Sequence, residues 1–376
     1  MGSLVQIQPR AFSEMKKQKV LVAMSGGVDS SVAALLLKNQ GYEVIGAFMK
    51  NWSDTKNQLT GECSWKDDRR VASKIASKLN IPLITLDFEK EYKKLVVDEM
   101  FRLYKKGITP NPDIDCNNKI KFPLLWKAAE KLNANYIATG HYSRIKNGKL
   151  LRARDESKDQ SYFLYRLNQK DLEHSLFPIG ELTKEEVREI ARKNKFPNFD
   201  RRSTTGICFI GKVNLKKFLQ KKIKPKKGKI LDPEGNLVGF HDGIYYYTIG
   251  QRLGPRFGID INRGKEIQRR WYVAKKDLKK NEIIAAPEEH DLLYRKEIFL
   301  KNQHWTKDKP KDKIKVLARI RQVCELLPAV LSYDKNKKQY KITLNKTITG
   351  ISEGQAAVLY SGLQVLGGGV ISFDKF

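Results

Sequence analysis

Short runs of apolar residues alternate with helix-like patterns through the first half of the chain. Residues 20–24 (VLVAM) form a continuous apolar run typical of a buried strand, and residues 30–40 have the pattern of a helix ending at Gly41. Strands alternating with helices predict βαβ units, and uniformly apolar strands predict a parallel sheet covered on both faces. The other elements predicted here are strands at 42–49, 82–88 and 136–140 and helices near 67–79, 89–106, 121–133 and 183–194.

The pattern changes after about residue 210. Residues 212–229 contain nine lysines and no acidic residue, and Pro225 and Gly228 interrupt any long helix. From residue 230 onward, short β-type runs are separated by Gly, Asn and Pro, which is typical of small β-rich modules. The sequence therefore predicts an α/β parallel-sheet domain followed by two β-rich domains, with bounds of 15–212 for the first, 213–290 for a small central domain and 291–376 for a C-terminal β-barrel.

The composition narrows the classes of function. Of the 376 residues 40% are hydrophobic and 30% charged, and no stretch approaches the ~20 apolar residues that a membrane helix requires, so we expect no membrane association. The 72 Lys and Arg exceed the 42 Asp and Glu, which gives a formal net charge of +30. Such an excess attracts polyanions. Nucleic acid is therefore the first candidate partner; charge alone would also allow an acidic membrane surface as a second, and a general lysine bias is the alternative explanation.

The cysteines and the N-terminus bear on the cellular compartment. The four cysteines are too few and too scattered for a disulfide framework or a zinc finger, which fits a reducing compartment. The first residues lack the apolar core of a secretory signal, and their single arginine gives little support for a mitochondrial transit peptide. Met15 is a second candidate start, which would make residues 1–14 a short extension. We expect a monomer in the bacterial cytoplasm, with the mitochondrial matrix as the alternative.

The strongest local motif is VLVAMSGGVDSS at residues 20–31. A strand runs into a Ser-Gly-Gly turn and then into a helix, so backbone N–H groups and the positive end of the helix face the same point. The motif has no GxxxxGK[ST] pattern and is therefore not a Walker A loop. A tight structural turn is the plain alternative. SGGxDS, however, resembles the PP-loop of ATP pyrophosphatases, which implies that ATP binds here and that Asp29 helps to hold Mg²⁺ at the pyrophosphate.

Residues 109–122 (TPNPDIDCNNKIKF) carry the second motif. Its two prolines predict a stiff, exposed loop, in which Asp113 stands three residues before Cys116. Lys119 and Lys121 follow closely, and neighbouring cations lower the pKa of a thiol. A lone cysteine is usually a small buried hydrophobe. The polar neighbours of Cys116 argue against burial, and we predict an exposed, reactive thiol.

The third motif is RRSTTGICFIG at residues 201–211. Taken alone, GICFIG is typical of an ordinary strand, with Cys208 in the core. Arg201 and Arg202 supply positive charge upstream, however, and residues 203–206 form a small polar approach suited to a thiol that moves between a donor and an acceptor. The residues leave both interpretations of Cys208 open. Cys63 and Cys324 have no motif around them, so structural or incidental roles are favoured.

Further strings extend the candidate site. ATGHYSR (138–144) ends a predicted strand at Gly140 and His141, the expected edge for a ligand in a parallel sheet. KDQSYFLYRL (158–167) interleaves charged and amide residues with aromatics, as stacking on unpaired bases requires. The β-rich C-terminal module adds ARIRQ (318–322) and GQAAVLYSG (354–362), which contain Arg319, Arg321 and Gln355.

In order along the chain, SGGVDSS, NPDxxCN, ATGHY, KDQSYFL, TGICFIG, YTIGQR (247–252) and the closing GLQVLGGGVI resemble the tRNA-specific 2-thiouridylases of the bacterial and mitochondrial MnmA type. SGGVDS alone would indicate only the PP-loop superfamily. NPDxxCN followed by GICFIG is far more specific, and the resemblance covers nearly the whole chain from about residue 18. It implies an ATP-consuming enzyme that introduces sulfur into a uridine of tRNA.

The resemblance also implies a mechanism. ATP adenylates the C2 oxygen of the wobble uridine and pyrophosphate leaves. Cys208 carries a persulfide received from a cysteine desulfurase or a sulfur-relay protein. Its terminal sulfur, or sulfide freed from it when Cys116 forms a disulfide with Cys208, attacks C2 and expels AMP. Asp113 acts as general acid or base. The ATP site implied in this way is Ala23, Met24, Ser25, Gly26, Gly27, Val28, Asp29, Ser30, Met49 and Gly140. The tRNA-contacting residues implied are Asn111, Pro112, Asp113, His141, Lys158, Asp159, Gln160, Arg319, Ile320 and Gln355.

The chain departs from the family pattern at two points. Ser203 stands where the family commonly has an acid, which leaves the charge control at Cys208 open, and Ile320 stands where an aromatic is usual. Three alternative functions remain. The first is another PP-loop enzyme that needs no cysteines, such as a lysidine or nucleotide synthetase. The second has Asp113, Cys116 and Cys208 ligate an iron–sulfur cluster. The third is a non-catalytic RNA-binding protein, supported by charge alone.

Overall fold

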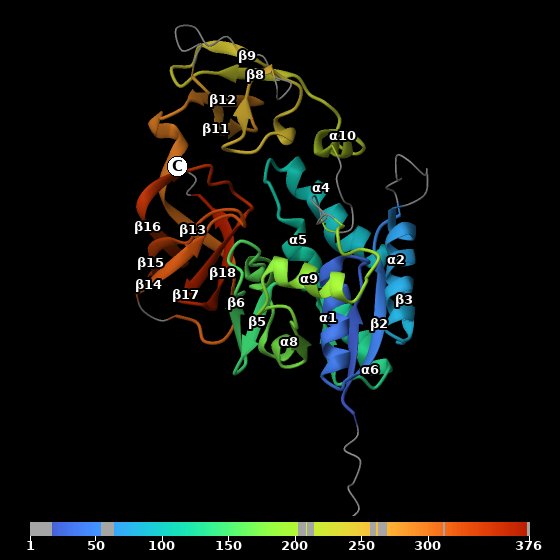
Figure 1. Ribbon diagram of the computed structural model, residues 1–376. Coiled ribbons are helices and arrows are strands. Elements are labelled where there is room, and N and C mark those ends of the chain that lie inside the picture. Colours follow the sequence, from blue (N-terminus) through green and yellow to red (C-terminus); the bar gives the residue numbers. More distant parts are fainter. Residues whose placement is uncertain are drawn as a thin grey trace, which may run out of the picture.

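The computed structural model describes residues 17–53, 64–201, 208, 214–255, 261, 269–310 and 313–373. Figure 1 shows three parts: an N-terminal domain with helices around a sheet, a small β domain in yellow and orange at the top, and a β-barrel in orange and red at the left. The predicted fold class, a parallel-sheet domain followed by two β-rich domains, is confirmed. None of the helices within the described ranges is both long enough and apolar enough to cross a membrane.

The N-terminal sheet has five parallel strands in the order β3-β2-β1-β4-β7. The predicted strands at 20–24, 42–49, 82–88 and 136–140 all form, and β1 lies between β2 and β4, where Val20 pairs with both Val44 and Tyr136. The carboxyl ends of β1 and β4 therefore meet at one edge, where the PP-loop and the ATGHY string begin. The bounds are β1 Lys19–Ala23, β2 Glu43–Lys50, β3 Leu83–Asp87, β4 Tyr136–Ala138 and β7 Ser175–Leu176.

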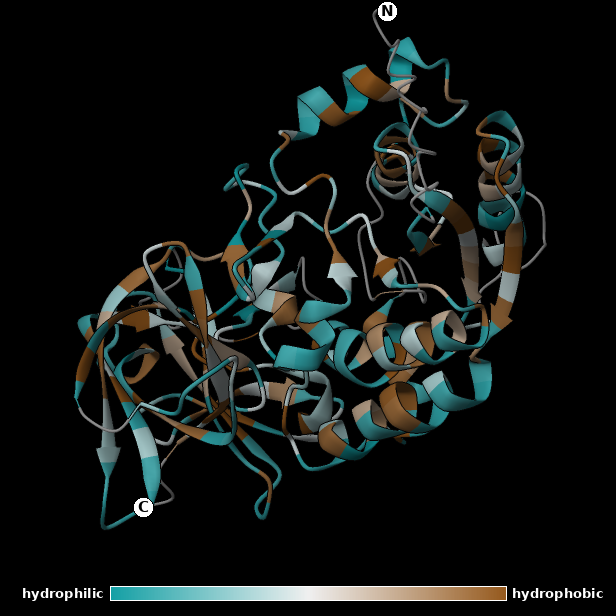
Figure 2. Cartoon of the chain, turned by 90° about the horizontal axis from the view of Figure 1, so that it is seen from below, coloured by the Kyte–Doolittle hydropathy of each residue, from teal (hydrophilic) through white to brown (hydrophobic). Residues whose placement is uncertain are grey.

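Helices cover both faces of this sheet. Successive residues of β1 point to opposite faces, so each residue packs against the helices on its own side. Val20 and Val22 pack in one hydrophobic cluster with helices α1 (Val28–Asn39), α2 (Ser64–Lys78) and α9 (Lys184–Lys193). Leu21 belongs to the other cluster, together with Met100 and Leu125 of the opposite layer. In Figure 2 the helices change between hydrophobic and hydrophilic colours along their length, as expected for helices with one buried face.

Two longer helices of the second layer contain π-helical turns. The predicted 89–106 helix forms as α3 (Glu89–Tyr92), a π-turn (Lys93–Val97) and α4 (Asp98–Lys105). The exposed loop expected over 109–122 is wrong beyond residue 111. Asn111 caps a helix by accepting a hydrogen bond from the backbone N–H of Ile114, and Pro112 occupies the first helical position, which suits its fixed φ. This helix comprises α5 (Pro112–Asp115), a π-turn (Cys116–Lys121) and α6 (Phe122–Lys131).

The central domain is a five-stranded sheet in the order β10-β11-β12-β8-β9. The third sheet closes into a barrel, because β13 pairs with both β16 and β18. The central strands are β8 Gly228–Leu231, β9 Leu237–His241, β10 Arg252–Leu253, β11 Trp271–Asp277 and β12 Glu282–Pro287. The barrel strands are β13 Tyr294–Trp305, β14 Ile314–Arg319, β15 Leu327–Asp334, β16 Gln339–Thr349, β17 Ala356–Ser361 and β18 Gln364–Ser372. Short helices complete the fold: α7 Ser161–Leu164, α8 Gln169–Glu173, α10 Leu215–Gln220 and the 3₁₀ turns Ile244–Tyr246 and Asp291–Leu293.

A hairpin of the N-terminal domain extends the barrel sheet. Strands β5 (Ser143–Lys146) and β6 (Lys149–Arg152) are joined by Asn147 and Gly148, both with positive φ, the combination that favours a two-residue hairpin turn. β6 pairs with β18 of the barrel, as Figure 1 shows. The residues between this hairpin and α7 include Lys158, Asp159 and Gln160, the KDQ string, so this string lies at the contact between the two domains.

Candidate active site

The PP-loop connects β1 to α1, and its glycines are required by close contacts. Gly26 has a φ of 75°, and a side chain there would collide with the backbone oxygen of Asp68. A Cβ atom on Gly140 would lie 2.6 Å from the backbone nitrogen of Ser30, so β4 also approaches the start of α1 closely. The hydroxyls of Ser30 and Ser31 both donate to the Gly27 carbonyl at 3.0 Å. The loop therefore presents backbone and hydroxyl groups without bulky side chains, as a phosphate chain requires.

Asp29, in the first turn of α1, is held by two side chains from other segments. Its Oδ1 atom accepts a 2.9 Å hydrogen bond from the Tyr142 hydroxyl and a 2.5 Å contact from Nζ of Lys184. Burial together with the charge of Asp29 raises the pKa of Tyr142, which keeps that hydroxyl protonated as a donor. Lys184 is the first residue of α9, directly after the Thr183 cap. The loop thus has a carboxylate and an ammonium group side by side at its phosphate-facing end.

A cleft of about 530 Å³ opens in front of this loop. Every residue expected to bind ATP lines it except Gly26, whose role is to shape the turn. The cleft continues to Asp113 and Cys208, so the nucleotide end and the thiol end share one space. Sequence reasoning assigned no role at this cleft to several other lining residues, namely Asn51, Trp52, Trp65, Asp68, Asn117, Tyr142, Phe163 and Lys184.

The two cysteines of the motifs meet at the far end of the cleft. The Sγ atoms of Cys116 and Cys208 lie 3.8 Å apart, and both thiols are free. Asp113 links the same two segments, because its Oδ1 atom accepts a 2.8 Å hydrogen bond from the backbone N–H of Cys208. The hydroxyl of Tyr92 donates to the Cys208 carbonyl. Neighbouring residues 202–207 and 209–213 lie outside the described residues, and so do Cys63 and residues 1–14.

The expectation that Cys116 is exposed is wrong, because its side chain is fully buried. Helical geometry is the reason. Asp115 and Lys119, one turn apart, form a 3.1 Å ion pair on the outer side of the helix, while Cys116 and Ile120 point into the core. Of the polar neighbours that suggested an exposed thiol, Asp115 and Lys119 therefore face away from Cys116, whereas Asp113, Asn117 and Lys121 line the cleft.

The environment polarises the thiol pair. A hydrogen bond from the Cys116 thiol lowers the pKa of Cys208 in spite of burial, and Lys121 lowers it further. Burial raises the pKa of Cys116 well above its usual range, and the hydrogen bond to Cys208 adds to the shift. Burial also raises the pKa of Asp113, against the opposing effects of the Cys208 N–H and Lys121. Of the two thiols, Cys208 therefore loses its proton more readily, and Cys116 is the one that holds its proton.

Lys121 and His141 complete the wall beside the thiols. Burial keeps the pKa of His141 well below its usual range, and the neighbouring Lys121 charge lowers it further, so the ring is neutral. Lys121 Nζ lies 3.4 Å from His141 Nε2, and Thr139 Oγ1 lies 2.7 Å from Nδ1. With an ammonium donor at Nε2, the ring proton sits on Nδ1 and is directed to Thr139. The charge of Lys121 thus favours the deprotonated form of both thiols. The sequence indicated this role only through the nearness of Lys121 to Cys116.

The residues expected to contact tRNA fall into two groups. Asp113, His141, Lys158 and Gln160 line the cleft. The others serve the fold: Asn111 and Pro112 begin α5, Asp159, Arg319 and Ile320 are buried, and both amide hydrogens of Gln355 go to the carbonyl oxygens of Thr109 and Pro110. Contact with tRNA stays a prediction for both groups.

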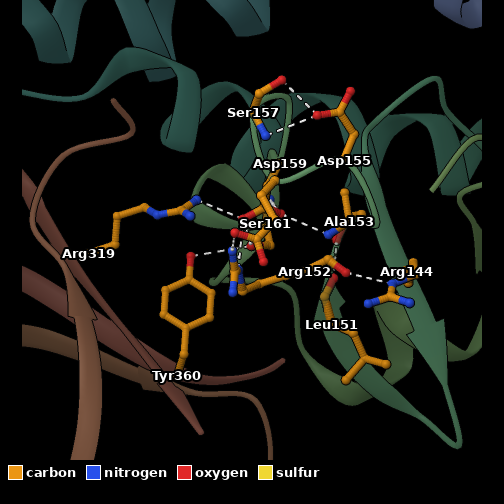
Figure 3. Close-up of polar contacts among 12 residues, drawn as sticks. Arg144, Leu151, Arg152, Ala153, Asp155, Ser157, Asp159, Ser161, Arg319 and Tyr360 are labelled. Atoms are coloured by element: carbon orange, nitrogen blue, oxygen red, sulfur yellow. Dashed lines mark hydrogen bonds and ion pairs between the residues drawn. The ribbon is translucent and has the colours of Figure 1, made fainter. Parts of the chain in front are cut away.

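Asp159 is the centre of a buried polar cluster between the N-terminal domain and the barrel (Figure 3). Its Oδ2 atom lies 2.7 Å from Nη1 of Arg319 and 3.7 Å from Nε of Arg152, and it accepts a 3.0 Å hydrogen bond from the Ser161 hydroxyl. The Tyr360 hydroxyl of β17 lies 3.3 Å from the same Ser161 oxygen. The charges compensate each other across the domain contact, which joins the KDQ string to the barrel.

Arg201, expected to influence Cys208, instead reaches the PP-loop. It donates to the Gly26 carbonyl at 3.3 Å and pairs with Asp68 at 2.5 Å. Burial raises the pKa of Asp68, and the Arg201 charge opposes that shift. Within the described part of the chain, no three His, Cys, Asp or Glu side chains are grouped so that they could hold a metal ion.

A parallel sheet with a glycine loop at its edge, opening on one cleft that ends at paired thiols, defines a nucleotide-binding enzyme that uses sulfur chemistry. Family models agree with this organisation along the chain: the tRNA methyl transferase HUP domain matches residues 18–212, the tRNA methyl transferase PRC-barrel domain 216–287 and the aminomethyltransferase beta-barrel domain 295–371. The chain belongs to the tRNA-specific 2-thiouridylase MnmA family.

Three relatives support this membership over nearly their whole length. The tRNA-specific 2-thiouridylase MnmA of Enterococcus faecalis is 39% identical over 367 residues, covering 96% of this chain and 96% of the relative. That of Lactobacillus helveticus is 41% identical, covering 94% and 95%. That of Coxiella burnetii (strain Dugway 5J108-111) is 42% identical, covering 95% and 99%.

Proposed function

We propose that this enzyme converts the C2 carbonyl of the wobble uridine in tRNA to a thiocarbonyl, with consumption of ATP and release of AMP and pyrophosphate. One observation carries the proposal: the thiols of Cys116 and Cys208 lie 3.8 Å apart at one end of the cleft that the PP-loop lines at the other. An enzyme that only adenylated its substrate would need the loop but not the thiols. The names of the relatives point the same way, since all three are called 2-thiouridylases.

The first half-reaction uses the loop end of the cleft. The uridine C2 oxygen attacks the α-phosphorus of ATP, the bond to the β-phosphate breaks, and pyrophosphate leaves. The loop's N–H groups and Lys184 hold the phosphates, and Mg²⁺, when bound, neutralises the charge on the departing pyrophosphate. Asp29 fits a site for this ion, because Mg²⁺ takes one or two protein carboxylates and completes its shell with phosphate oxygens and water.

The second half-reaction uses the thiol end. Cys208, loaded as a persulfide by a cysteine desulfurase or sulfur-relay protein, attacks C2 with its terminal sulfur, and AMP leaves with the former C2 oxygen. Cys116, after losing its proton to Asp113, attacks the Sγ atom of Cys208. The sulfur–sulfur bond of the persulfide breaks, its electron pair forms the thiocarbonyl, and a Cys116–Cys208 disulfide remains. A thiol reductant must return two electrons to this disulfide before the next turnover.

The alternative of an iron–sulfur cluster has less support. Three ligands would have to come from Asp113, Cys116 and Cys208, but the Asp113 carboxylate is engaged by the Cys208 N–H and these residues do not form a metal-binding group. We further propose that the chain works as a monomer of three functional parts, 15–212, 213–290 and 291–376, in the bacterial cytoplasm, with the mitochondrial matrix as the alternative.

Substitution of the carrier cysteine tests the proposal. Cys208→Ser should abolish formation of 2-thiouridine while tRNA-dependent release of pyrophosphate survives, because adenylation needs only the loop and the uridine. Cys324→Ser, a free cysteine outside the cleft, is the matched control and should keep both activities. Equal loss of both activities in a folded Cys208→Ser protein, or full thiolation by it, would contradict the assignment of Cys208 as the carrier.

A further inference from the structure

The segment 107–111, which leads into the helix of Asp113 and Cys116, is contacted by both downstream domains. From the central domain, Nζ of Lys276 in β11 donates to the Gly107 carbonyl at 2.6 Å and to the Tyr247 carbonyl at 2.8 Å. The hydroxyls of Thr109 and Thr248 lie 3.0 Å apart. The central domain therefore holds both ends of the first half of this segment.

The barrel holds the second half. Nε2 of Gln355 donates to the Thr109 carbonyl at 3.0 Å and to the Pro110 carbonyl at 2.9 Å. The backbone N–H of Thr109 donates to the Glu353 carbonyl at 3.3 Å. Between them, Gly354 has a φ of 89°, and a side chain on it would collide with Ile108. The two segments, 107–111 and the one that contains Gly354, thus approach each other so closely that only glycine fits at position 354.

This anchoring reaches the thiols through a short rigid path. Pro110 is followed by the helix cap Asn111 and by Pro112 at the first helical position, so little backbone freedom separates the anchored carbonyls from Asp113. Asp113 in turn binds the Cys208 N–H, and Cys116 follows within the next turn. Displacement of the segment would therefore change the position of Cys116 relative to Cys208.

Lys276 is a costly way to make a purely structural contact. Burial lowers its pKa to about 8, which measures the cost of placing an ammonium group away from water. An apolar side chain would pack there without this cost, but it could not bind two carbonyl oxygens from different domains. The lysine therefore fixes the separation of two backbone segments rather than merely filling space.

We propose that Lys276 and Gln355 are positioning residues for sulfur transfer: by holding segment 107–111 from two domains they set the distance between the Cys116 and Cys208 thiols. The inference takes its reaction from the proposed function, but the geometry that it predicts can be measured without tRNA or ATP. In this role both amide hydrogens of Gln355 are used in its bonds to the Thr109 and Pro110 carbonyl oxygens.

The experiment measures how fast the full-length protein forms a Cys116–Cys208 disulfide with diamide, which removes two electrons and two protons from a thiol pair. Peptide mass mapping identifies the bond. The variants are Lys276→Met and Gln355→Glu, whose carboxylate cannot donate to the two carbonyl oxygens. Matched controls are Lys275→Met, an exposed neighbour on the same strand, and Gln339→Glu on β16.

Both variants should form the disulfide at least about tenfold more slowly than the unmodified protein, whereas the controls stay within about twofold. Lys276→Arg, which keeps a cationic donor, should restore part of the rate. Unchanged rates in folded Lys276→Met and Gln355→Glu, or equal slowing in the controls, would overturn the proposal. If Lys276→Met does not fold, Gln355→Glu and Lys276→Arg carry the test: both should form the disulfide more slowly than the unmodified protein, and unchanged rates in both would overturn the proposal. Normal disulfide formation in an unmodified protein that makes no 2-thiouridine would count against the proposed function alone.

Discussion

Replacement of Asp159 by alanine should separate a structural from a tRNA-contacting role of the KDQ string. The Asp159 side chain is 0% exposed and that of Arg319 only 6%, and their 2.7 Å ion pair joins the N-terminal domain to the barrel. Removing one partner of a buried pair leaves the other charge uncompensated, which typically costs about 3–5 kcal/mol. Loss of the hydrogen bonds from Ser161 and from the backbone N–H of Ala153 adds to this cost.

The expected order of stability follows from what each variant leaves behind. Asp159→Asn keeps an acceptor oxygen but loses the charge, so it should lie between the unmodified protein and Asp159→Ala. In Asp159→Ala/Arg319→Met neither charge of this pair remains and Arg152 keeps its ion pair with Glu156, so part of the loss should be recovered. Glu156→Ala in the same loop is the control. Glu156 pairs with Arg152 at 3.1 Å but is 70% exposed, so its removal should cost about 0–1 kcal/mol.

The assay is a urea titration that follows the first unfolding transition, together with tRNA affinity measured under conditions where every variant is folded. Asp159→Ala should lower the free energy of unfolding by about 3–5 kcal/mol and change the affinity of the folded protein little. The reasoning is refuted if Asp159→Ala costs no more than Glu156→Ala while tRNA affinity falls. Asp159 would then act on the tRNA and not on the domain contact.

Three further predictions concern the cleft and the charge of the protein. Asp29→Ala and Ser30→Ala should each weaken ATP turnover while tRNA affinity, measured by filter binding, stays near its original value; equal loss of both would mean that the loop also binds tRNA. The logarithm of the tRNA binding constant should fall linearly with the logarithm of salt concentration, because neutralised phosphates release counterions; a flat salt series would contradict an electrostatic interface. Because its pKa is lowered, Cys208 should react with iodoacetamide at lower pH than an ordinary thiol, and Lys121→Met should move the inflection of the rate–pH curve upward. An unchanged inflection in Lys121→Met would mean that Lys121 does not lower the pKa of Cys208.

Local sequence patterns were sufficient for the elements that form the ATP end of the site. The strand at 20–24, the glycine turn and the helix that follows are close in sequence, so their geometry depends on local rules. The same rules could have identified the helix at Asn111 and Pro112, since an Asn cap followed by proline is a recognised start signal. The polar residues around Cys116 outweighed that signal and gave the wrong exposure.

Long-range contacts could not be predicted from the sequence alone. Cys116 and Cys208 are 92 positions apart, and no periodicity brings them together. The hairpin at Asn147 and Gly148 had a local turn signal, but its partner strand β18 lies in another domain. The buried contacts of Arg319 likewise depend on how the barrel packs against the first domain. A string of charged and aromatic residues looks the same in sequence whether it faces RNA or a neighbouring domain.

The central claim is that one turnover moves one sulfur atom from Cys208 to uridine and leaves a Cys116–Cys208 disulfide. A single-turnover reaction tests it most directly. The protein is loaded with heavy-isotope persulfide and mixed with ATP and tRNA without reductant, and tRNA nucleosides and protein peptides are then analysed by mass spectrometry. The account predicts heavy 2-thiouridine and the Cys116–Cys208 disulfide in equal amounts. Heavy 2-thiouridine with both cysteines still reduced, or the disulfide without labelled uridine, would contradict it.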